Sequence, residues 1–161
     1  MQYCSPHAEE LADRNASIGT GGGIATQLSS SGQFWSCQKQ TRALLSIKKP
    51  YADAIFRGEK LFEFRRSVFR KAVDVVIVYV TSPTCEVAGE FDVSDVISES
   101  VEDLWNRTSS HAGIDRDGFF SYFEGCEIAH AIVIGKVRKY REPLDLGETF
   151  GIRAPQSFVY D

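Results

Sequence analysis

The sequence of 161 residues lacks several features that would place it in a well-defined class of protein. No apolar run approaches the roughly 20 residues that a membrane-spanning helix needs, so we expect no membrane partner. No charged segment followed by an apolar one opens the chain, so we expect a cytoplasmic protein rather than a secreted one. The three glycines at 21–23 have neither a preceding strand nor a following Lys-Ser or Lys-Thr, which excludes a phosphate-binding loop there.

Cysteine and histidine are too few and too scattered to indicate a metal site. The four cysteines form no C-x-x-C pair, and the three histidines lie far apart in the chain: Cys4, Cys37, Cys85, Cys126, His7, His111 and His130. Reduced thiols in a cytosolic protein are the expected state. We therefore expect neither a metal ion nor a cofactor.

Charge is distributed unevenly, although the net charge is only −4. A negative net charge argues against a protein that coats DNA without sequence preference. However, residues 48–71 carry eight basic side chains against three acidic ones, and residues 136–141 form a second basic cluster. Residues 74–127 between them are strongly acidic. The sequence leaves open whether the two basic clusters converge in one patch or form separate solvated faces.

The apolar pattern divides the chain into two parts. Residues 1–42 are rich in serine and glycine, so we expect an N-terminal tail without chemistry of its own. Residues 43–161 are predicted to form one domain. Its strands are expected at 43–47, 61–66, 73–81, 85–97 and 128–140, and its helices at 51–57, 100–107 and 115–124. Residues 143–160 are expected to be irregular.

Local signals refine these expectations. The run 73–81 is β-branched almost throughout, which is typical of a strand buried on both faces. Gly89 in the middle of the next strand predicts a bulge or a bend. Ser100 is expected to cap the second helix, and the aromatic residues at 119–123 are expected to lie in the core. Short turns between adjacent strands favour antiparallel pairing, so an α+β fold with a small curved sheet flanked by helices is predicted.

The densest group of charged side chains lies at residues 58–66, which read G-E-K-L-F-E-F-R-R. Charges at this density on an alternating apolar framework are costly unless they pair with one another or face a polar ligand. The segment is therefore the first candidate for a functional site.

Gly58, Lys60, Glu63 and Arg65 match the pattern G-x-K-x-x-E-x-R, and in this motif the chain resembles the ASCH (activating signal cointegrator homology) domains. The resemblance covers residues 43–160 and extends to the bacterial and phage-borne members. It implies a PUA-like fold: a small, mixed, mostly antiparallel β-barrel flanked by helices, with a cleft beside the first helix.

The resemblance also implies a function. Members of the family are linked to RNA binding and to the regulation of transcription or translation. Some small bacterial members hydrolyse the N4-acyl group of modified cytidine with the motif lysine, and others are described as ribonucleases. In the hydrolase branch a threonine stands where this chain has Glu63.

Lys60 and Glu63 are the candidate catalytic residues. Beside two arginines in a partly desolvated cleft, the Lys60 amine would lose its proton more easily and act as a base or a nucleophile. If it pairs with Glu63 instead, it stays charged and holds a phosphate or a base edge. Glu63 is expected either to carry a proton, to accept from a nucleobase amino group, or to pair with Arg65.

Further residues are candidates for ligand or RNA binding. They are Lys48, Tyr51, Arg65, Arg66, Gln156 and Ser157. Arg65 shares a strand face with the carboxylate of the motif, whereas Arg66 points to the opposite face and is expected to meet solvent or a phosphate backbone. Tyr51 is a candidate to stack on a base or to pack over the helix terminus.

Three readings of function follow. The first is an RNA- or nucleotide-binding domain with a regulatory role and a cleft around the motif. The second is an enzyme, either an amidohydrolase acting on N4-acylated cytidine or a metal-independent ribonuclease. The third is a module that binds a regulatory protein partner through the acidic helices. The sequence does not determine the oligomeric state.

Overall fold

The computed structural model describes residues 40–160, so the expected tail lies outside the described residues except for positions 40–42. The elements follow one another in the order β1 Arg42–Ile47, α1 Lys49–Phe56, β2 Phe62–Arg65, β3 Val75–Val80, β4 Glu86–Ser100, α2 Val101–Thr108, the short 3-10 helix η1 Ser109–His111, α3 Arg116–Tyr122, β5 Ile128–Leu144, α4 Leu146–Phe150 and β6 Phe158–Tyr160. The order of the first eight regular elements is as predicted. Among these residues no helix is both long and apolar enough to span a membrane.

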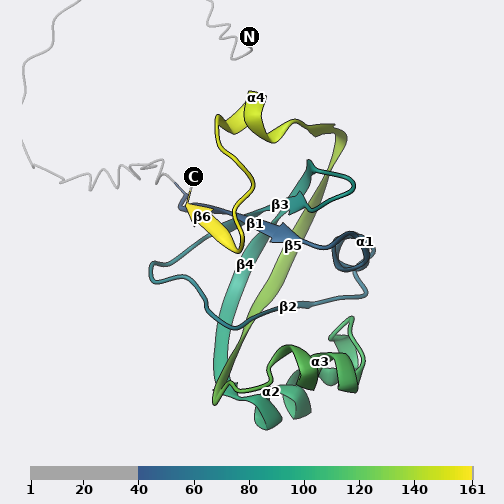
Figure 1. Cartoon of the computed structure of the whole chain (residues 1–161), viewed down its shortest axis with the longest axis vertical. Coiled ribbons are helices and arrows are strands. Elements are labelled where there is room, and N and C mark those ends of the chain that lie inside the picture. Colours follow the sequence, from purple (N-terminus) through teal and green to yellow (C-terminus); the bar gives the residue numbers. More distant parts are fainter. Residues whose placement is uncertain (1–39, 161) are drawn as a thin grey trace, which may run out of the picture. The chain divides into compact units, whose positions relative to one another are not determined.

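The six strands form one mixed sheet in the order β2-β5-β4-β3-β1-β6 (Figure 1). β1 pairs parallel with β3, and every other pair in the sheet is antiparallel. The sheet curls into a half-barrel with a few helices around it, which confirms the predicted α+β class. Strand β3 is buried at all six positions, as its β-branched composition indicates.

The sheet curls along its two longest strands, β4 and β5. Their pairing shifts register at three places, and one of these shifts falls between Val87 and Gly89. A Cβ on Gly89 would lie 2.5 Å from the carbonyl oxygen of Arg138 and 2.7 Å from the ring of Phe56. The predicted bulge at Gly89 is therefore confirmed, and it lets α1 pack closely against the strands.

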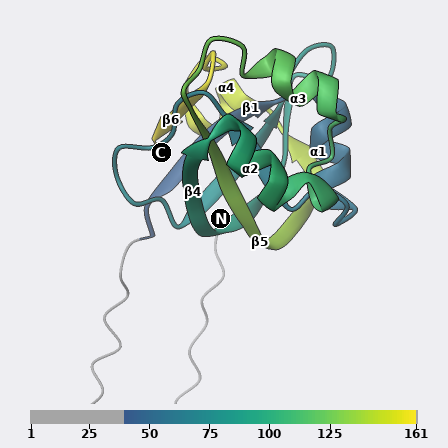
Figure 2. The same cartoon turned by 90° about the horizontal axis from the view of Figure 1, so that it is seen from below.

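Two helices cover the far end of this long strand pair, as Figure 2 shows for α2 and α3. Ser100 caps α2 by accepting a hydrogen bond from the Asp103 backbone amide, as predicted. Phe119 and Phe123 are fully buried against the sheet, which confirms the prediction of a core position. The same prediction is wrong for Tyr122, which is 40% exposed.

The prediction of an irregular segment at 143–160 is also wrong. Strand β5 continues to Leu144, the helix α4 follows, and β6 pairs antiparallel with β1. Asp145 caps α4 by accepting from the Glu148 amide, and Gly151 ends it with a φ of +66°. Both elements are too short to show a periodic pattern, and β6 depends on a partner strand more than 100 residues earlier in the chain.

Candidate functional site

A cavity of about 510 Å³ opens where the ends of β1 and β2 approach α1 and α3. Its polar and charged lining comes from segments that are far apart in the sequence: Ser46, Lys48, Tyr51, Lys60, Glu63, Arg65, Thr81, Ser121, Tyr122 and Gln156. Strands β1 and β2 stand four places apart in the order of the sheet, so the curl of the half-barrel is what brings them to the same cavity.

Lys60 is buried at this cavity with only 3% of its surface exposed. Its Nζ donates a hydrogen bond of 2.6 Å to the carbonyl oxygen of Ala112. The same nitrogen lies 4.6 Å from the ring centroid of Phe64 and 5.3 Å from that of Tyr51. Aromatic faces attract a cation, so these rings stabilise the charged form in part.

Glu63 and Arg65 form a buried ion pair beside this lysine. Nη2 of Arg65 lies 3.3 Å from Oε1 of Glu63, and Nζ of Lys60 lies 4.0 Å from Oε2. Both pair members are less than one-tenth exposed. One carboxylate thus stands between two cations in a site with little access to water, where charge interactions are much stronger than at the surface.

Arg65 also links β2 to β1 across the curled sheet. Its Nη2 donates a hydrogen bond of 2.9 Å to the carbonyl oxygen of Ser46 at the end of β1. Its Nε is buried and has no hydrogen-bond partner within residues 40–160. Buried donors are nearly always paired, and this unpaired one belongs to a side chain that lines the cavity.

Burial changes the proton affinity of two cavity residues. Desolvation lowers the pKa of the Lys60 ammonium, Glu63 partly opposes this, and the charge of Arg65 adds to it. Desolvation likewise raises the pKa of the Tyr122 phenol. The lowered pKa increases the fraction of Lys60 that is an uncharged amine near neutral pH. Only this uncharged form can act as a base.

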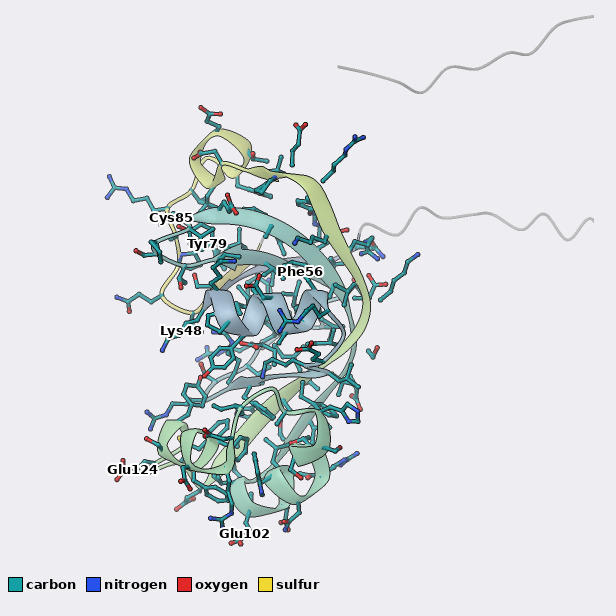
Figure 3. All side chains as sticks on the ribbon, turned by 90° about the vertical axis from the view of Figure 1, so that its right-hand side faces the viewer. Lys48, Phe56, Tyr79, Cys85, Glu102 and Glu124 are labelled. Atoms are coloured by element: carbon teal, nitrogen blue, oxygen red, sulfur yellow. The ribbon has the colours of Figure 1, made fainter. Side chains whose placement is uncertain are left out.

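Aromatic and polar side chains line the cavity together with the charged group of Lys60, Glu63 and Arg65. Tyr51 comes from α1 and Tyr122 from α3, so two phenol rings line the cavity from different helices. Lys48 is exposed beside the start of α1, as Figure 3 shows, and Gln156 lines the cavity from the segment before β6. The cavity therefore offers hydrogen-bond donors and acceptors together with aromatic rings.

Six of the eight predicted site residues line this cavity: Lys48, Tyr51, Lys60, Glu63, Arg65 and Gln156. The remaining two do not. Arg66 turns away and donates to the carbonyl oxygen of Glu124 at 2.8 Å and to Sγ of Cys126 at 3.1 Å. Ser157 contacts the neighbouring strand instead, where its backbone carbonyl oxygen accepts a hydrogen bond from the Ser46 amide at 3.1 Å.

The second basic cluster at 136–141 is absent from the lining of the cavity. Arg138 is instead bound to Glu90 at 2.7 Å and to Asp92 at 2.6 Å on the neighbouring strand β4. Lys139 approaches α1 at one place, with its Nζ 5.8 Å from the ring centroid of Phe56. The positive charge of Arg138 is therefore neutralised within the sheet.

Sequence reasoning missed four polar residues of the cavity: Ser46, Thr81, Ser121 and Tyr122. Ser46 lies within the apolar strand β1, and Thr81 directly follows β3. Polar side chains are common at strand ends, so neither residue carries a specific signal. Tyr122 follows two phenylalanines at helical spacing, and only its place on the exposed side of α3 separates it from them. Within the described residues, no group of three His, Cys, Asp or Glu side chains could hold a metal ion.

A family model, one curated relative and several solved structures name the same family. A family model described as the ASCH domain matches residues 45–143. An ASCH domain-containing ribonuclease from Zymomonas mobilis subsp. mobilis is 32% identical over 123 residues, which cover 73% of this chain and 82% of that protein. The crystal structure of ASCH from Zymomonas mobilis superposes with a TM-score of 0.70 at 29% identity, covering 74% of this chain and 87% of that one.

Two further relatives are longer proteins of Ureaplasma parvum serovar 3. The chain is 41% identical over 118 residues to a large ribosomal subunit protein uL22, and 36% identical over 124 residues to an ATP synthase subunit alpha. The matches cover 73% and 76% of this chain, but it spans only 38% and 15% of the length of those two proteins. The family match covers more than half of this sequence, and the chain therefore belongs to the ASCH domain family.

Proposed function

We propose that this domain binds RNA and that the cavity around Lys60 takes one unpaired nucleotide. The observation that carries the proposal is the buried group of Lys60, Glu63 and Arg65, in which the arginine Nε has no hydrogen-bond partner among residues 40–160. Nucleobase edges present the complementary acceptors and amino groups, and unpaired bases are the usual targets of sequence-specific RNA recognition. A volume of about 510 Å³ suits one nucleoside rather than a duplex.

The walls of the cavity support the same proposal. Tyr51 and Tyr122 line it with aromatic rings, on which a base can stack whatever its identity. Lys48 is exposed at the edge of the cavity and supplies attraction for the phosphate backbone. Since Arg66 and Arg138 are bound to other parts of the fold, we assign them no direct role in phosphate binding.

Cleavage of the bound RNA is the second candidate function. One relative of this chain is a ribonuclease, and the buried Lys60 has a lowered pKa in a cavity that holds a carboxylate 4.0 Å away. In this reaction the free amine of Lys60 removes the proton of a ribose 2′-hydroxyl. The 2′ oxygen then attacks the adjacent phosphorus, the bond to the 5′ oxygen breaks, and the 5′ oxygen leaves with the proton that Lys60 took up, relayed through the Glu63 carboxylate. No metal ion is required for these steps.

The test uses three proteins: the wild type, Lys60→Ala, and Lys71→Ala as a control for loss of an exposed lysine away from this cavity. Each is incubated with a mixed RNA pool that includes N4-acetylcytidine. RNA retention on a filter is measured at low and high salt, and the products are identified by mass spectrometry. Circular dichroism establishes that each variant is folded.

The binding proposal predicts salt-sensitive retention by the wild type and by Lys71→Ala, and clearly weaker retention by Lys60→Ala. Shortened RNA that forms with the wild type but not with Lys60→Ala would show that the domain is a ribonuclease. Release of acetate would show that it is an amidohydrolase. No retention by the wild type at low salt, with a folded protein, would refute the proposal. It would favour a module that binds a protein partner.

A further inference from the structure

The backbone over Lys60 is unusually close to its side chain. A Cβ built on Gly113 would lie 2.8 Å from Cβ and Cγ of Lys60 and 2.9 Å from its Cδ. Real Cβ atoms do not approach other atoms to this distance, so any larger residue at this position would displace the lysine or the loop. Gly113 also has a φ of +64°, a conformation that residues with a side chain rarely adopt.

The loop that carries Gly113 is fixed on both sides of this contact. Before it, the carbonyl oxygen of His111 accepts from the Leu61 backbone amide at 3.1 Å, and Ala112 is 1% exposed in the core beneath α2 and α3. After it, Asp115 caps α3. The carbonyl oxygen of Ala112, which accepts the bond from the Lys60 amine, is thus part of an anchored segment rather than of a free loop.

We propose that Gly113 is a positioning residue for Lys60: because it has no side chain, the backbone of residues 112 and 113 closes over the lysine and fixes its amine beside the cavity. The backbone at Gly113 leaves no room for a Cβ beside the Lys60 methylene groups, and the Ala112 carbonyl oxygen accepts a hydrogen bond from the nitrogen at 2.6 Å. The use of this amine toward RNA rests on the proposed function, whereas the packing that positions it does not.

The proposal explains why Lys60 is buried at all. Lysine side chains normally extend into water, and burial without a full counterion is unfavourable. The charged and titratable groups that line the same cavity are Glu63 and Arg65 from β2, Lys48 and Tyr51 at the start of α1, and Tyr122 from α3. The 112–113 backbone lies close to the Lys60 methylene groups and contributes to their burial.

The chain offers a matched control for the test. Gly151 has a φ of +66°, but a Cβ at this position would meet no atom of the described part of the chain within 4 Å. Gly113→Ala and Gly151→Ala therefore carry a similar backbone strain, and only the first meets Lys60. The reactivity of each lysine with acetic anhydride is measured against pH by mass spectrometry, without RNA, with Lys71 as the exposed reference.

For the wild type we expect the pH at the midpoint of Lys60 labelling to lie below that of Lys71. We also expect a lower plateau rate of labelling for Lys60, because its side chain is buried. With Gly113→Ala we expect the midpoint to rise toward that of Lys71 and the plateau rate to increase. Gly151→Ala should leave both unchanged. A folded Gly113→Ala protein with the wild-type midpoint and plateau would overturn the proposal, whatever the outcome of RNA binding.

A second measurement covers the case in which Gly113→Ala does not fold. Melting temperatures of both glycine variants are compared in the wild-type and in the Lys60→Ala background, where the Cγ and Cδ contacts no longer exist. We expect the extra loss caused by Gly113→Ala over Gly151→Ala to shrink in the Lys60→Ala background. The contact with Cβ of residue 60 remains in both backgrounds, so an equal extra loss would show that the glycine does not act on the lysine side chain beyond Cβ and would overturn the proposal.

Discussion

Replacement of Glu63 by glutamine tests whether the buried charges of the site contribute more to stability than an exposed ion pair does. Glu63 is 6% exposed, and its carboxylate lies 3.3 Å from Arg65 and 4.0 Å from Lys60. Glu63→Gln keeps the size of the side chain and removes only its charge. Two cations then share a desolvated cavity without an anion.

The expected loss of stability follows from this burial. Removing one partner of a buried ion pair costs about 3–5 kcal/mol, because the remaining charge is left without compensation. Glu59→Gln is the matched control in the same motif. The Glu59 carboxylate lies 2.7 Å from Arg57, but both side chains are more than half exposed, so its loss should leave the stability close to that of the wild type.

The deficit of Glu63→Gln should depend on pH. Burial lowers the pKa of Lys60 in the folded protein and Glu63 raises it again in part, so the variant has a lower Lys60 pKa than the wild type. Between that lowered pKa and the ordinary value in the unfolded chain, the unfolded state binds more protons than the folded one. Stability therefore rises with pH across this window, and more so in the variant. The deficit is largest at the acidic side of the window and shrinks toward alkaline pH.

Urea unfolding followed by circular dichroism at several pH values measures these free energies of unfolding. The m-values should agree between variants, so that a change in midpoint reports stability. Equal, small losses for Glu63→Gln and Glu59→Gln would refute the reasoning, and so would a large Glu63→Gln deficit that stays constant as the pH rises.

Two further predictions concern RNA binding. Tyr122→Ala should weaken binding by about 1–3 kcal/mol through loss of a stacking surface while Tyr122→Phe retains it, as filter binding would measure; equal loss in both variants would contradict stacking. Arg138→Ala should lower the melting temperature, because it breaks the bonds to Glu90 and Asp92, and leave RNA affinity and its salt dependence unchanged. A reduced salt slope would instead show that Arg138 contacts phosphate.

The regular elements and the motif could be read from the sequence because they depend on local patterns. The β-branched run of β3, the capping serine of α2 and the glycine bulge of β4 all have strong local signals, and each is confirmed. The failures have a common origin. Helix α4 and strand β6 are too short for a periodic signal, and the pairing of β6 with β1 is decided by contacts distant in sequence.

The candidate site shows the same division. Alternation along β2 placed Glu63 and Arg65 on one face, and the structure brings both to the cavity with Lys60. Alternation also separated Arg66 from them, and the structure binds it to Glu124 on another part of the fold. No local pattern separates Tyr122 from the neighbouring core phenylalanines.

The sequence by itself determined the family, the α+β class and the charged motif, because apolar period, capping residues and motif spacing are properties of neighbouring residues. Only the tertiary structure decided which charges meet. The curl of the sheet joins Arg65 to the Ser46 carbonyl oxygen, and the loop at Gly113 closes over Lys60. These contacts link residues 19 and more than 50 positions apart, and burial there makes an ordinary lysine a candidate base.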